Sequence, residues 1–278
     1  MNPLRLELWE NTPGSGEYTP YLLYYQPKER CSDGAVLLVP GSAYRTNPSM
    51  PKQEGERVCE YLCERGIAVF MLVYRVHSGG CYPLPILDGR RAMRLLRYHC
   101  EEFAINPSKI VTLGYSAGGH LCASLTGYHE PLEGEGVDEI DRESYVPNLQ
   151  ALCYPVISFD TLKEYTHKGS VVNLLGEKNA HLAQELSFEQ SLTRPTPPTF
   201  LFHNFDDAEV GVQNSLLYAC RLRELGTPVE LHVYPDGGHG VGLAIDEKPS
   251  SRHNCDWLSR FVNWLIYNGF TRDKGEGM

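Results

Sequence analysis

The sequence predicts an α/β fold in which a mainly parallel sheet carries helices on both faces. Three observations support this prediction. Short apolar runs, rich in β-branched and aromatic residues, recur along the chain. Helical patterns separate most of these runs, as in strand–helix–strand units. Several runs are apolar at nearly every residue, as expected for strands that are buried on both faces.

Eight of these runs are predicted to be strands of one sheet. In chain order they are Leu4–Trp9, Tyr21–Tyr25, Ala35–Val39, Ile67–Tyr74, Ile110–Leu113, Ala151–Tyr154, Thr199–His203 and Val229–Tyr234. No helical pattern lies between the first two runs, so they should form an antiparallel hairpin. The others mostly alternate with helices and should lie parallel. Because no linker or internal repeat divides the chain, residues 1–278 are expected to form a single domain.

The clearest helical patterns are predicted at residues 87–103, 214–225 and 255–267. Gly226 and Gly269 follow the second and third patterns and should end those helices. Four arginines fall mostly off the apolar stripe of the first pattern: Arg90, Arg91, Arg94 and Arg97. We expect these arginines to form a solvated helix face.

Two segments depart from the alternation of strands and helices. Glu130–Glu143 is acidic and contains glycine, which is typical of a surface loop. Residues 156–198 lie between two predicted strands and are too many for a plain connection. In this architecture an insertion of that kind commonly covers an active site, so residues 156–198 are predicted to form a small cap.

Composition narrows the classes of function. The formal net charge is -10 and no basic run offsets it, which argues against nucleic acid or an anionic membrane as partners. The first residues are charged where a signal peptide would be apolar, and no apolar run is long enough to cross a bilayer. The nine cysteines are scattered and form no C-x-x-C pair, so we expect reduced thiols in a cytoplasmic protein.

Gly114–Gly118 reads Gly-Tyr-Ser-Ala-Gly directly after the predicted strand Ile110–Leu113, and a helix-forming stretch follows. In this context the G-x-S-x-G pattern indicates a tight strand-to-helix turn from which a serine hydroxyl projects. Glycines are needed because side chains two residues before and after the serine would collide with neighbouring backbone. The pattern therefore predicts that Ser116 is a nucleophile.

A serine nucleophile needs a base, and the base needs an orienting carboxylate. His239 lies in the glycine-rich segment 235–240, just after the last predicted strand, where open α/β sheets build their sites. The carboxylate should follow the strand Thr199–His203, where either Asp206 or Asp207 could serve. The order serine, aspartate, histidine along the chain is that of the α/β-hydrolases.

An oxyanion hole needs two convergent N–H donors. One should be the amide of Ala117, immediately after the nucleophile. The other should come from the loop after the strand Ala35–Val39, where Ser42 or Ala43 would supply it. No metal or cofactor is expected, because the sequence contains no H-E-x-x-H spacing, no phosphate-binding loop and no dinucleotide fingerprint.

With these residues in place, the chain resembles the α/β-hydrolase superfamily along essentially its whole length. More narrowly, it is similar to bacterial esterases grouped with acetyl-xylan esterases and lipase/esterase proteins, of the hormone-sensitive-lipase-like and prolyl-oligopeptidase-like branches. The resemblance lies in four segments: Pro40–Tyr44, Gly114–Leu121, Pro195–Asp207 and Glu230–Gly240. It implies an α/β-hydrolase fold with an eight-stranded, mostly parallel sheet, helices on both faces and a small cap insertion.

Two details of the resemblance concern the site. In that family the catalytic aspartate is followed by x-x-Val, a pattern that Asp207 fits and Asp206 does not. Ser42 and Ala43 stand where the family has glycines, so their Cβ atoms should crowd the oxyanion loop.

The resemblance implies a serine carboxylesterase that acts on short acyl esters, including O-acetyl groups on sugars or xylo-oligosaccharides. Its partner would then be a small-molecule ester, and a homodimer is an open alternative. Aromatic residues near the predicted site could line the substrate pocket: Tyr44, Tyr115 and Phe205. Two other interpretations stay open, a small serine peptidase of the prolyl-oligopeptidase type and a non-catalytic hydrolase fold used for binding.

Overall fold

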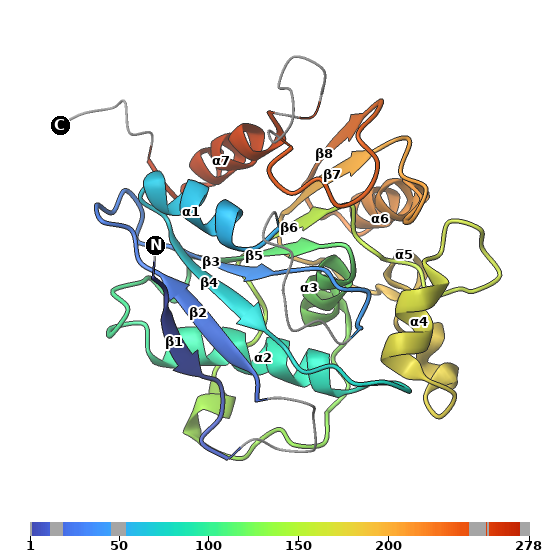
Figure 1. The fold of residues 1–278 in the computed structure, drawn as a ribbon, viewed down its shortest axis with the longest axis horizontal. Helices are drawn as coiled ribbons and strands as arrows, with labels where there is room; N and C mark the ends of the chain where they lie inside the picture. Colours follow the sequence, from blue (N-terminus) through green and yellow to red (C-terminus); the bar gives the residue numbers. More distant parts are fainter. Residues whose placement is uncertain (1, 12–18, 46–53, 245–253, 255, 273–278) are drawn as a thin grey trace.

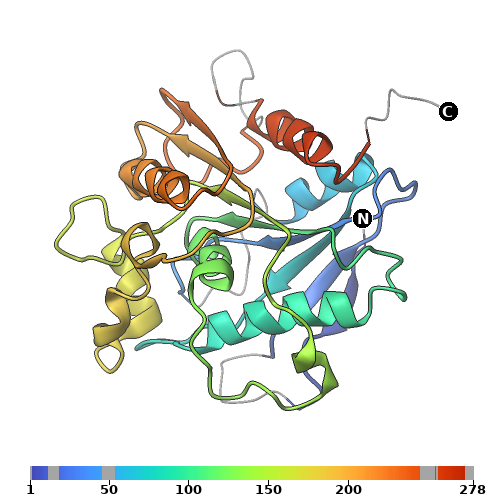
Figure 2. The same ribbon diagram turned by 180° about the vertical axis from the view of Figure 1, so that it is seen from behind.

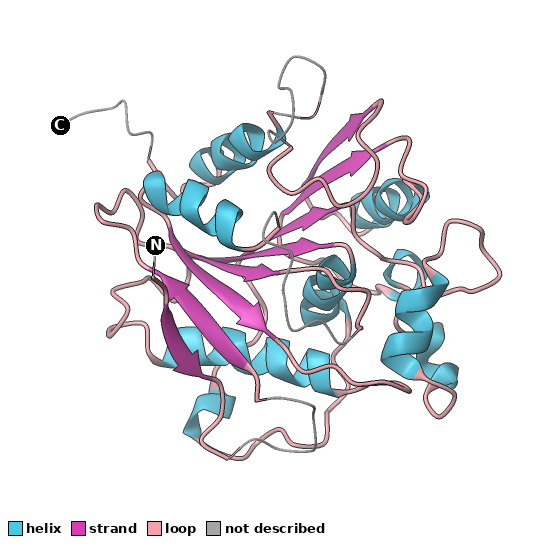
Figure 3. Ribbon diagram, in the orientation of Figure 1, coloured by secondary structure: helices cyan, strands magenta, loops and turns pink. Residues whose placement is uncertain are grey.

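Eight strands of the described residues form one sheet at the centre of the molecule (Figures 1 and 3). The structure is a computed structural model that describes all residues except 1, 12–18, 46–53, 245–253, 255 and 273–278. The strands are β1 (Leu4–Glu7), β2 (Tyr21–Tyr25), β3 (Ala35–Val39), β4 (Ala68–Val73), β5 (Ile110–Tyr115), β6 (Leu149–Cys153), β7 (Thr199–Asn204) and β8 (Val229–Tyr234). Their order in space is β1-β2-β4-β3-β5-β6-β7-β8.

Strand pairing follows the predicted pattern. β2 pairs with both β1 and β4 in antiparallel fashion, whereas every other neighbouring pair is parallel. The arrowheads of β3, β4 and β5 point toward the side of the molecule where α4 lies (Figure 1). Because parallel strands end at a common edge, the loops after β3, β5, β7 and β8 meet there. The predicted hairpin and the mostly parallel sheet are both confirmed.

Helices cover both faces of the sheet (Figures 1 and 2). On one face they are α2 (Leu84–Tyr98), α3 (Ala117–Gly127) and α6 (Gln213–Glu224). Residues of α4 (Lys168–Leu175) and α5 (Phe188–Ser191) belong to the same hydrophobic cluster, and α4 lies beyond the arrowheads of the strands (Figure 1). The other face carries α1 (Glu56–Glu64) and α7 (Trp257–Tyr267). Two short 3₁₀ helices span Glu139–Arg142 and Ala180–Ala183. Among the described residues, no helix is long and apolar enough to cross a membrane.

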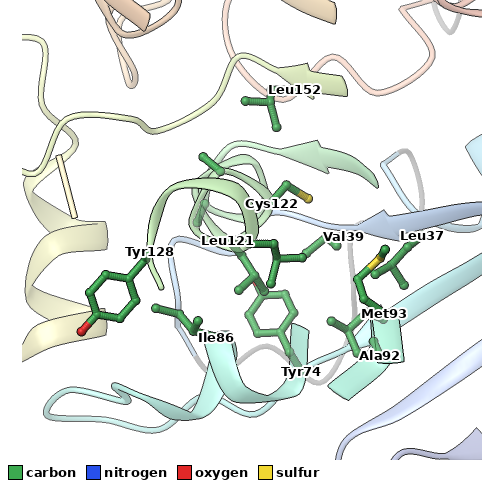
Figure 4. Packing of buried hydrophobic residues seen from close by; sticks show 14 of the residues in the cluster. Leu37, Val39, Tyr74, Ile86, Ala92, Met93, Leu121, Cys122, Tyr128 and Leu152 are labelled. Carbon is green, nitrogen blue, oxygen red and sulfur yellow. The ribbon is translucent and has the colours of Figure 1, made fainter. Parts of the chain in front are cut away.

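The strand sequences explain this layering. β3 is fully buried, with Ala35, Leu37 and Val39 in one hydrophobic cluster and Val36 and Leu38 in the other. Successive side chains of a strand point to opposite faces, so a strand between two helix layers must be apolar throughout. Figure 4 shows the first cluster, where Leu121 of α3 lies beside Val39 and Tyr74, and Met93 of α2 lies near Leu37.

α2 differs from the predicted range 87–103, because it begins at Leu84 and ends at Tyr98. His99 leaves helical geometry with a φ of -97° and a ψ of 23°, and turns follow up to Ala104. Phe103 still packs in the same hydrophobic cluster as the helix. The regular spacing of apolar residues therefore continues past the end of the helix, because the turn that follows keeps Phe103 in the core.

The prediction of a solvated arginine face on α2 is wrong. The four arginines are only 1% to 9% exposed: Arg90, Arg91, Arg94 and Arg97. The acidic segment Glu130–Glu143, predicted to be a plain surface loop, lies against α2 and supplies carboxylate partners to Arg90, Arg91 and Arg94. We call the four arginines, together with Glu135, Asp138 and Asp141, the arginine seam.

The seam compensates its buried charges with short hydrogen bonds. Arg91 donates to Asp138 at 2.6 Å and to Asp141 at 3.0 Å. Arg97 instead donates to backbone carbonyls, those of Pro107, Ser144 and Val146. An uncompensated buried charge would cost several kcal/mol, so these partners make burial of the arginines possible. The partners lie far along the chain from α2, so the period of the helix alone could not reveal them.

Candidate active site

Ser116 is the only residue between β5 and α3. Its φ of 52° and ψ of -119° lie in a region that non-glycine residues rarely adopt. Its amide donates to the carbonyl of Cys153, and its carbonyl accepts from the amides of His120 and Val156. The backbone of the serine is thus held from both α3 and the end of β6, and the side chain projects at the carboxyl edge of the sheet.

The glycines of the turn allow close approach of neighbouring backbone. A Cβ atom at Gly114 would overlap the carbonyl of Gly118, and a Cβ atom at Gly118 would overlap the carbonyl of Val39 at the end of β3. Side chains at these two positions would therefore push α3 away from the sheet. The predicted need for glycine on both sides of Ser116 is confirmed.

The structure brings together three side chains that the sequence singles out. Nε2 of His239 lies 2.9 Å from Oγ of Ser116, and Nδ1 of His239 lies 2.7 Å from Oδ2 of Asp207. The side chain of His239 is 12% exposed and that of Asp207 is fully buried. The row of hydrogen bonds therefore runs from a partly accessible hydroxyl and imidazole to a carboxylate in the interior.

Asp207 is held rigidly in this position. Its Oδ1 accepts from the amides of Glu209 at 3.0 Å and Val210 at 2.9 Å. On the other oxygen, Nε2 of His203 lies 3.3 Å from Oδ2. A carboxylate with this many donors keeps a fixed orientation toward His239 and favours its charged form.

Asp206 has a different position and fixes the loop that carries His239. Its carboxylate accepts from the amides of Gly237 at 3.2 Å and Gly238 at 2.9 Å. Asn204 reinforces the loop by donating to the carbonyl of Gly238 at 2.8 Å. Of the two aspartates that the sequence left open, only the second faces the imidazole.

The electrostatics of the row favour proton transfer to His239. Burial raises the pKa of Asp207, but hydrogen bonds from His203 and His239 and from the Val210 amide outweigh burial and hold that pKa well below its usual range. Burial lowers the pKa of His239, yet the hydrogen bond and the charge of Asp207 raise it to a net value above 6.5. The imidazolium that forms when Ser116 loses its proton is therefore stabilised.

The loop after β3 runs against the nucleophile. A Cβ atom at Gly41 would lie 2.9 Å from Cβ of Ser116, which leaves no room for a side chain there. Ala43 in the same loop has a φ of 53°, which glycine adopts more easily than alanine. Within the described part of the chain, the amides of Ser42, Ala43 and Ala117 donate no hydrogen bond. Amides of this kind beside a serine nucleophile are suited to bind an oxyanion.

Tyr44 ties this loop to α3. Its hydroxyl lies 2.9 Å from Nδ1 of His120, and Nε2 of His120 lies 3.0 Å from the carbonyl of Leu186. A carbonyl only accepts, so Nε2 carries the hydrogen and Nδ1 accepts from the tyrosine hydroxyl. Burial lowers the pKa of His120 to about 4, which keeps the ring neutral. His120 thus supports the loop and takes no part in the Ser116 row.

The prediction that Tyr44 and Tyr115 line a substrate pocket is wrong. Both side chains have no exposed surface. Tyr115 packs against Tyr154 and Trp257, with ring centroids 5.8 Å and 6.1 Å apart. Tyr115 ends β5 and Tyr44 lies in the loop after β3, but both rings are buried in the core. Phe205 differs, because it is 66% exposed, and its place in a pocket stays a prediction.

Residues 156–198 border the site. Asn173 of α4 donates to the carbonyl of Ala43 at 2.8 Å, which joins the insertion to the loop after β3. Burial and the positive charge of His239 lower the pKa of His167, at the start of α4, so the two imidazoles are close enough to interact. The insertion therefore contacts both the loop after β3 and the neighbourhood of His239.

Two further residues lie near the site, and the sequence points to only one of them. Glu54 is 5% exposed, and its Oε1 accepts from the hydroxyl of Tyr154 at 2.7 Å. The ring of Tyr154 lies against that of His239, with centroids 4.9 Å apart. Glu54 belongs to no motif, so only its burial reveals it. Tyr154 directly follows β6, the neighbour of β5, and its place at the carboxyl edge was the one available signal.

The polar groups that converge on Ser116 are an imidazole, carboxylates and backbone amides, a set suited to acyl transfer. In the part of the chain that the structure describes, no three His, Cys, Asp or Glu side chains are grouped to hold a metal ion. The eight cysteines of that part are free thiols.

Known proteins resemble this chain in sequence and in structure. Residues 22–222 match the BD-FAE family. The acetyl ester-xyloside bifunctional hydrolase from Caldicellulosiruptor lactoaceticus is 36% identical, with a TM-score of 0.84 over 97% of this chain and 98% of that chain. The Endo-1,4-beta-xylanase B of Butyrivibrio fibrisolvens is 32% identical over 87% of this chain. The acetylxylan esterase of Xylanibacter ruminicola is also 32% identical, over 85% of this chain.

The extent of these similarities differs. The chain spans 38% of the length of the Butyrivibrio protein and 46% of the length of the Xylanibacter protein. An esterase from Thermogutta terrifontis, 23% identical with a TM-score of 0.77, shares the fold. The family match covers most of the chain, from β2 through most of α6. The chain is therefore an α/β-hydrolase of the esterase type and belongs to the BD-FAE family.

Proposed function

We propose that this protein is a serine carboxylesterase that hydrolyses short-chain acyl esters, including O-acetyl groups on sugars and xylo-oligosaccharides. The observation that carries the proposal is the row of hydrogen bonds from Ser116 through His239 to Asp207. The names of the acetylxylan esterase and the acetyl ester-xyloside hydrolase support acetylated sugars as the substrate class.

The reaction would begin at the serine. Oγ of Ser116 attacks the ester carbonyl while Nε2 of His239 takes its proton. Asp207 accepts from Nδ1 of His239, which sets the tautomer of the ring and stabilises its charged form. His239 then passes the proton to the departing alcohol, and the acyl group stays on Ser116.

The second half repeats these steps with water. His239 removes a proton from water, which attacks the acyl-serine, and the acid departs as Ser116 regains its proton. In both halves the carbonyl oxygen becomes negative. The amide of Ala117 and that of Ser42 or Ala43 would donate to this oxygen.

The small size of the insertion, compared with the lid of a lipase, supports a short acyl group as substrate. We propose that residues 156–198 form a small cap within a single domain of residues 1–278, since Asn173 contacts the loop of Ala43. Phe205, exposed and next to the aspartate pair, is the aromatic residue that we assign to the substrate pocket. A homodimer and a cytoplasmic location also remain proposals, to be tested by light scattering and by cell fractionation.

The test is a panel of p-nitrophenyl esters of rising chain length together with acetylated xylo-oligosaccharides. We expect kcat/KM to be highest for acetyl and other short acyl groups, and Ser116→Ala to show no turnover above background. A rate that rises up to long acyl chains would reject the short-acyl substrate class. A Ser116→Ala protein as active as the parent would reject the serine mechanism.

Two further substrates in the panel address other activities. An aminoacyl anilide cleaved faster than any ester would favour the peptidase interpretation. A p-nitrophenyl xyloside tests for the second activity that the name of the Caldicellulosiruptor protein includes. Absence of turnover throughout the panel would favour a binding protein.

A further inference from the structure

Glu54 is a buried carboxylate that the proposed mechanism does not use. It lies just before α1, and Oε1 accepts from the hydroxyl of Tyr154 at 2.7 Å. The backbone of Gly41, in the loop after β3, also forms a hydrogen bond with Glu54. A Cβ atom at Gly41 would lie 3.3 Å from Oε2 of Glu54, so the two residues are in close contact. One carboxylate therefore contacts both the loop after β3, Pro40–Tyr44, which we call the oxyanion loop, and the end of β6.

Tyr154 extends this contact to the histidine loop. Its hydroxyl accepts from the amide of Gly242 at 3.3 Å, and its ring meets the ring of His239 at an angle of 66°. Tyr154 has a φ of 35°, which is rare for a bulky residue and requires support from its surroundings. The loop of His239 is thus held at both ends, by Asp206 before the imidazole and by Tyr154 after it.

The directions of these hydrogen bonds suit an ionised Glu54. The Gly242 amide can only donate, so the oxygen of Tyr154 accepts from it and the tyrosine hydrogen points to Glu54. Gly41 donates as well, so Glu54 receives donors only, as an ionised carboxylate requires. Burial raises the pKa of Glu54 above its usual value, and the hydrogen bond from Tyr154, the charge of His239 and the hydrogen bond from Gly41 offset only part of this rise.

We propose that Glu54 is a positioning residue for ester hydrolysis, which holds the oxyanion loop through Gly41 and the histidine loop through Tyr154 and stabilises the imidazolium of His239 by its charge. This inference rests on the proposed function and deepens it. His239 gains and loses a proton in each half of the reaction, and a fixed negative charge in a buried site favours the charged ring without reorganising.

Several ionisable groups surround this pair. Those facing His239 are Ser116, Tyr154, His167, Asp207, Glu209 and Glu54. Those facing Glu54 are Tyr115, Cys153, Tyr154, Glu209 and His239. The carboxylates among them favour the charged imidazole, so loss of the negative charge at Glu54 should lower the pKa of His239.

The test compares Glu54→Gln with Glu56→Gln, a matched change at an exposed glutamate in the first turn of α1. For Glu54→Gln we expect kcat on p-nitrophenyl acetate to fall about 10- to 100-fold, with a smaller change in KM. We expect the acid limb of its kcat/KM profile to move down by about half a pH unit. Glu56→Gln should keep the kcat, the KM and the pH profile of the parent.

Two measurements separate this role from a merely structural one. The burst of nitrophenol counts competent active sites, so that kcat refers to folded protein alone. Tyr154→Phe keeps the carboxylate but removes the hydroxyl that joins it to Gly242, and its kcat should fall less than that of Glu54→Gln. A Glu54→Gln protein with a lower Tm but with the kcat and acid limb of the parent would overturn the inference.

Ser116→Ala distinguishes the two proposals. If Ser116→Ala is inactive while Glu54→Gln matches the parent, the role of Glu54 is rejected and the esterase mechanism stands. If Ser116→Ala keeps the activity of the parent, the proposed function itself is rejected.

Discussion

The row of Ser116, His239 and Asp207 and the arginine seam both bury charged groups, but they use them differently. The arginines of the seam stay protonated at any pH at which the protein folds, and carboxylates and carbonyls surround them. In the row, the central imidazole can change its charge near neutral pH. Beside the row lie amides without partners among the described residues.

This difference shows that buried charge by itself does not mark an active site. The seam joins a loop to α2, and in that loop positive φ angles occur at glycines, Gly134 and Gly136. At Ser116 the backbone is forced into a rare conformation, and His239 has a raised pKa. Changes in the seam should therefore affect stability and leave turnover unchanged, whereas changes in the row should lower turnover whatever their effect on stability.

The largest effect is expected at the aspartate pair. Asp207→Asn should lower kcat by about 10⁴-fold, because an amide cannot keep His239 in the required tautomer. Asp206→Asn changes only the loop contacts, and we expect a loss of about tenfold or less. Steady-state kinetics on p-nitrophenyl acetate checks both variants. Equal losses in the two would contradict the assignment of Asp207.

In the seam, Asp141→Asn should lower the free energy of unfolding by about 3 kcal/mol, because Arg91 loses a buried partner. The kcat of the folded protein should stay unchanged. Urea denaturation and ester kinetics measure the two effects. Glu139→Gln, at an exposed position in the same 3₁₀ turn, is the control and should change stability by about 0.5 kcal/mol or less. A large loss of kcat in Asp141→Asn would contradict the expectation that changes in the arginine seam leave turnover unaffected.

The row should also respond to pH. Since Asp207 raises the pKa of His239 above 6.5, and since only neutral imidazole can act as a base, kcat/KM should rise with pH through a midpoint above 6.5. A raised pKa stabilises the fold at low pH, and this contribution is lost as pH rises through the pKa of the folded protein. A kcat/KM profile measured from pH 5 to 9 tests the midpoint. A midpoint below 6.5 would contradict the ion pair.

The smallest effect is expected beside the site. Tyr44→Phe leaves Nδ1 of His120 without a donor in a buried position, which should cost about 1 to 2 kcal/mol of unfolding free energy. Because the loop of Ala43 loses a contact, a modest decrease in kcat should accompany it. Thermal unfolding and kinetics test the change, with the exposed Tyr98→Phe as control. An unchanged free energy of unfolding would contradict a stabilising role for the hydrogen bond between Tyr44 and His120.

The central strands β3, β5 and β6 were predictable because each is buried on both faces and is therefore mostly apolar. β2 and β8 are only partly buried, and they too have the bounds expected from their apolar and aromatic residues. Ser116 was predictable for a related reason: the turn excludes side chains at Gly114 and Gly118, and that requirement is visible in the residues.

Other features depend on contacts between distant parts of the chain. The buried arginines of α2 look like a solvated face until the segment Glu130–Glu143 lies over them. The positions of Tyr44 in the loop after β3 and of Tyr115 at the end of β5 were visible, but the direction of each ring depends on the side chains around it. Glu54 carries no local pattern at all, and only its burial beside Tyr154 makes it notable.

From the residues alone follow the parallel sheet, the serine at its sharp turn, and a histidine and an aspartate pair at the same edge. Each of these depends on local backbone geometry or on the spacing of apolar residues, and a short stretch of sequence already contains both. Only the folded chain decides which aspartate faces His239, which charges are buried and which amides lack partners. Those outcomes depend on distances between groups far apart along the chain, and no pattern of neighbouring residues contains them.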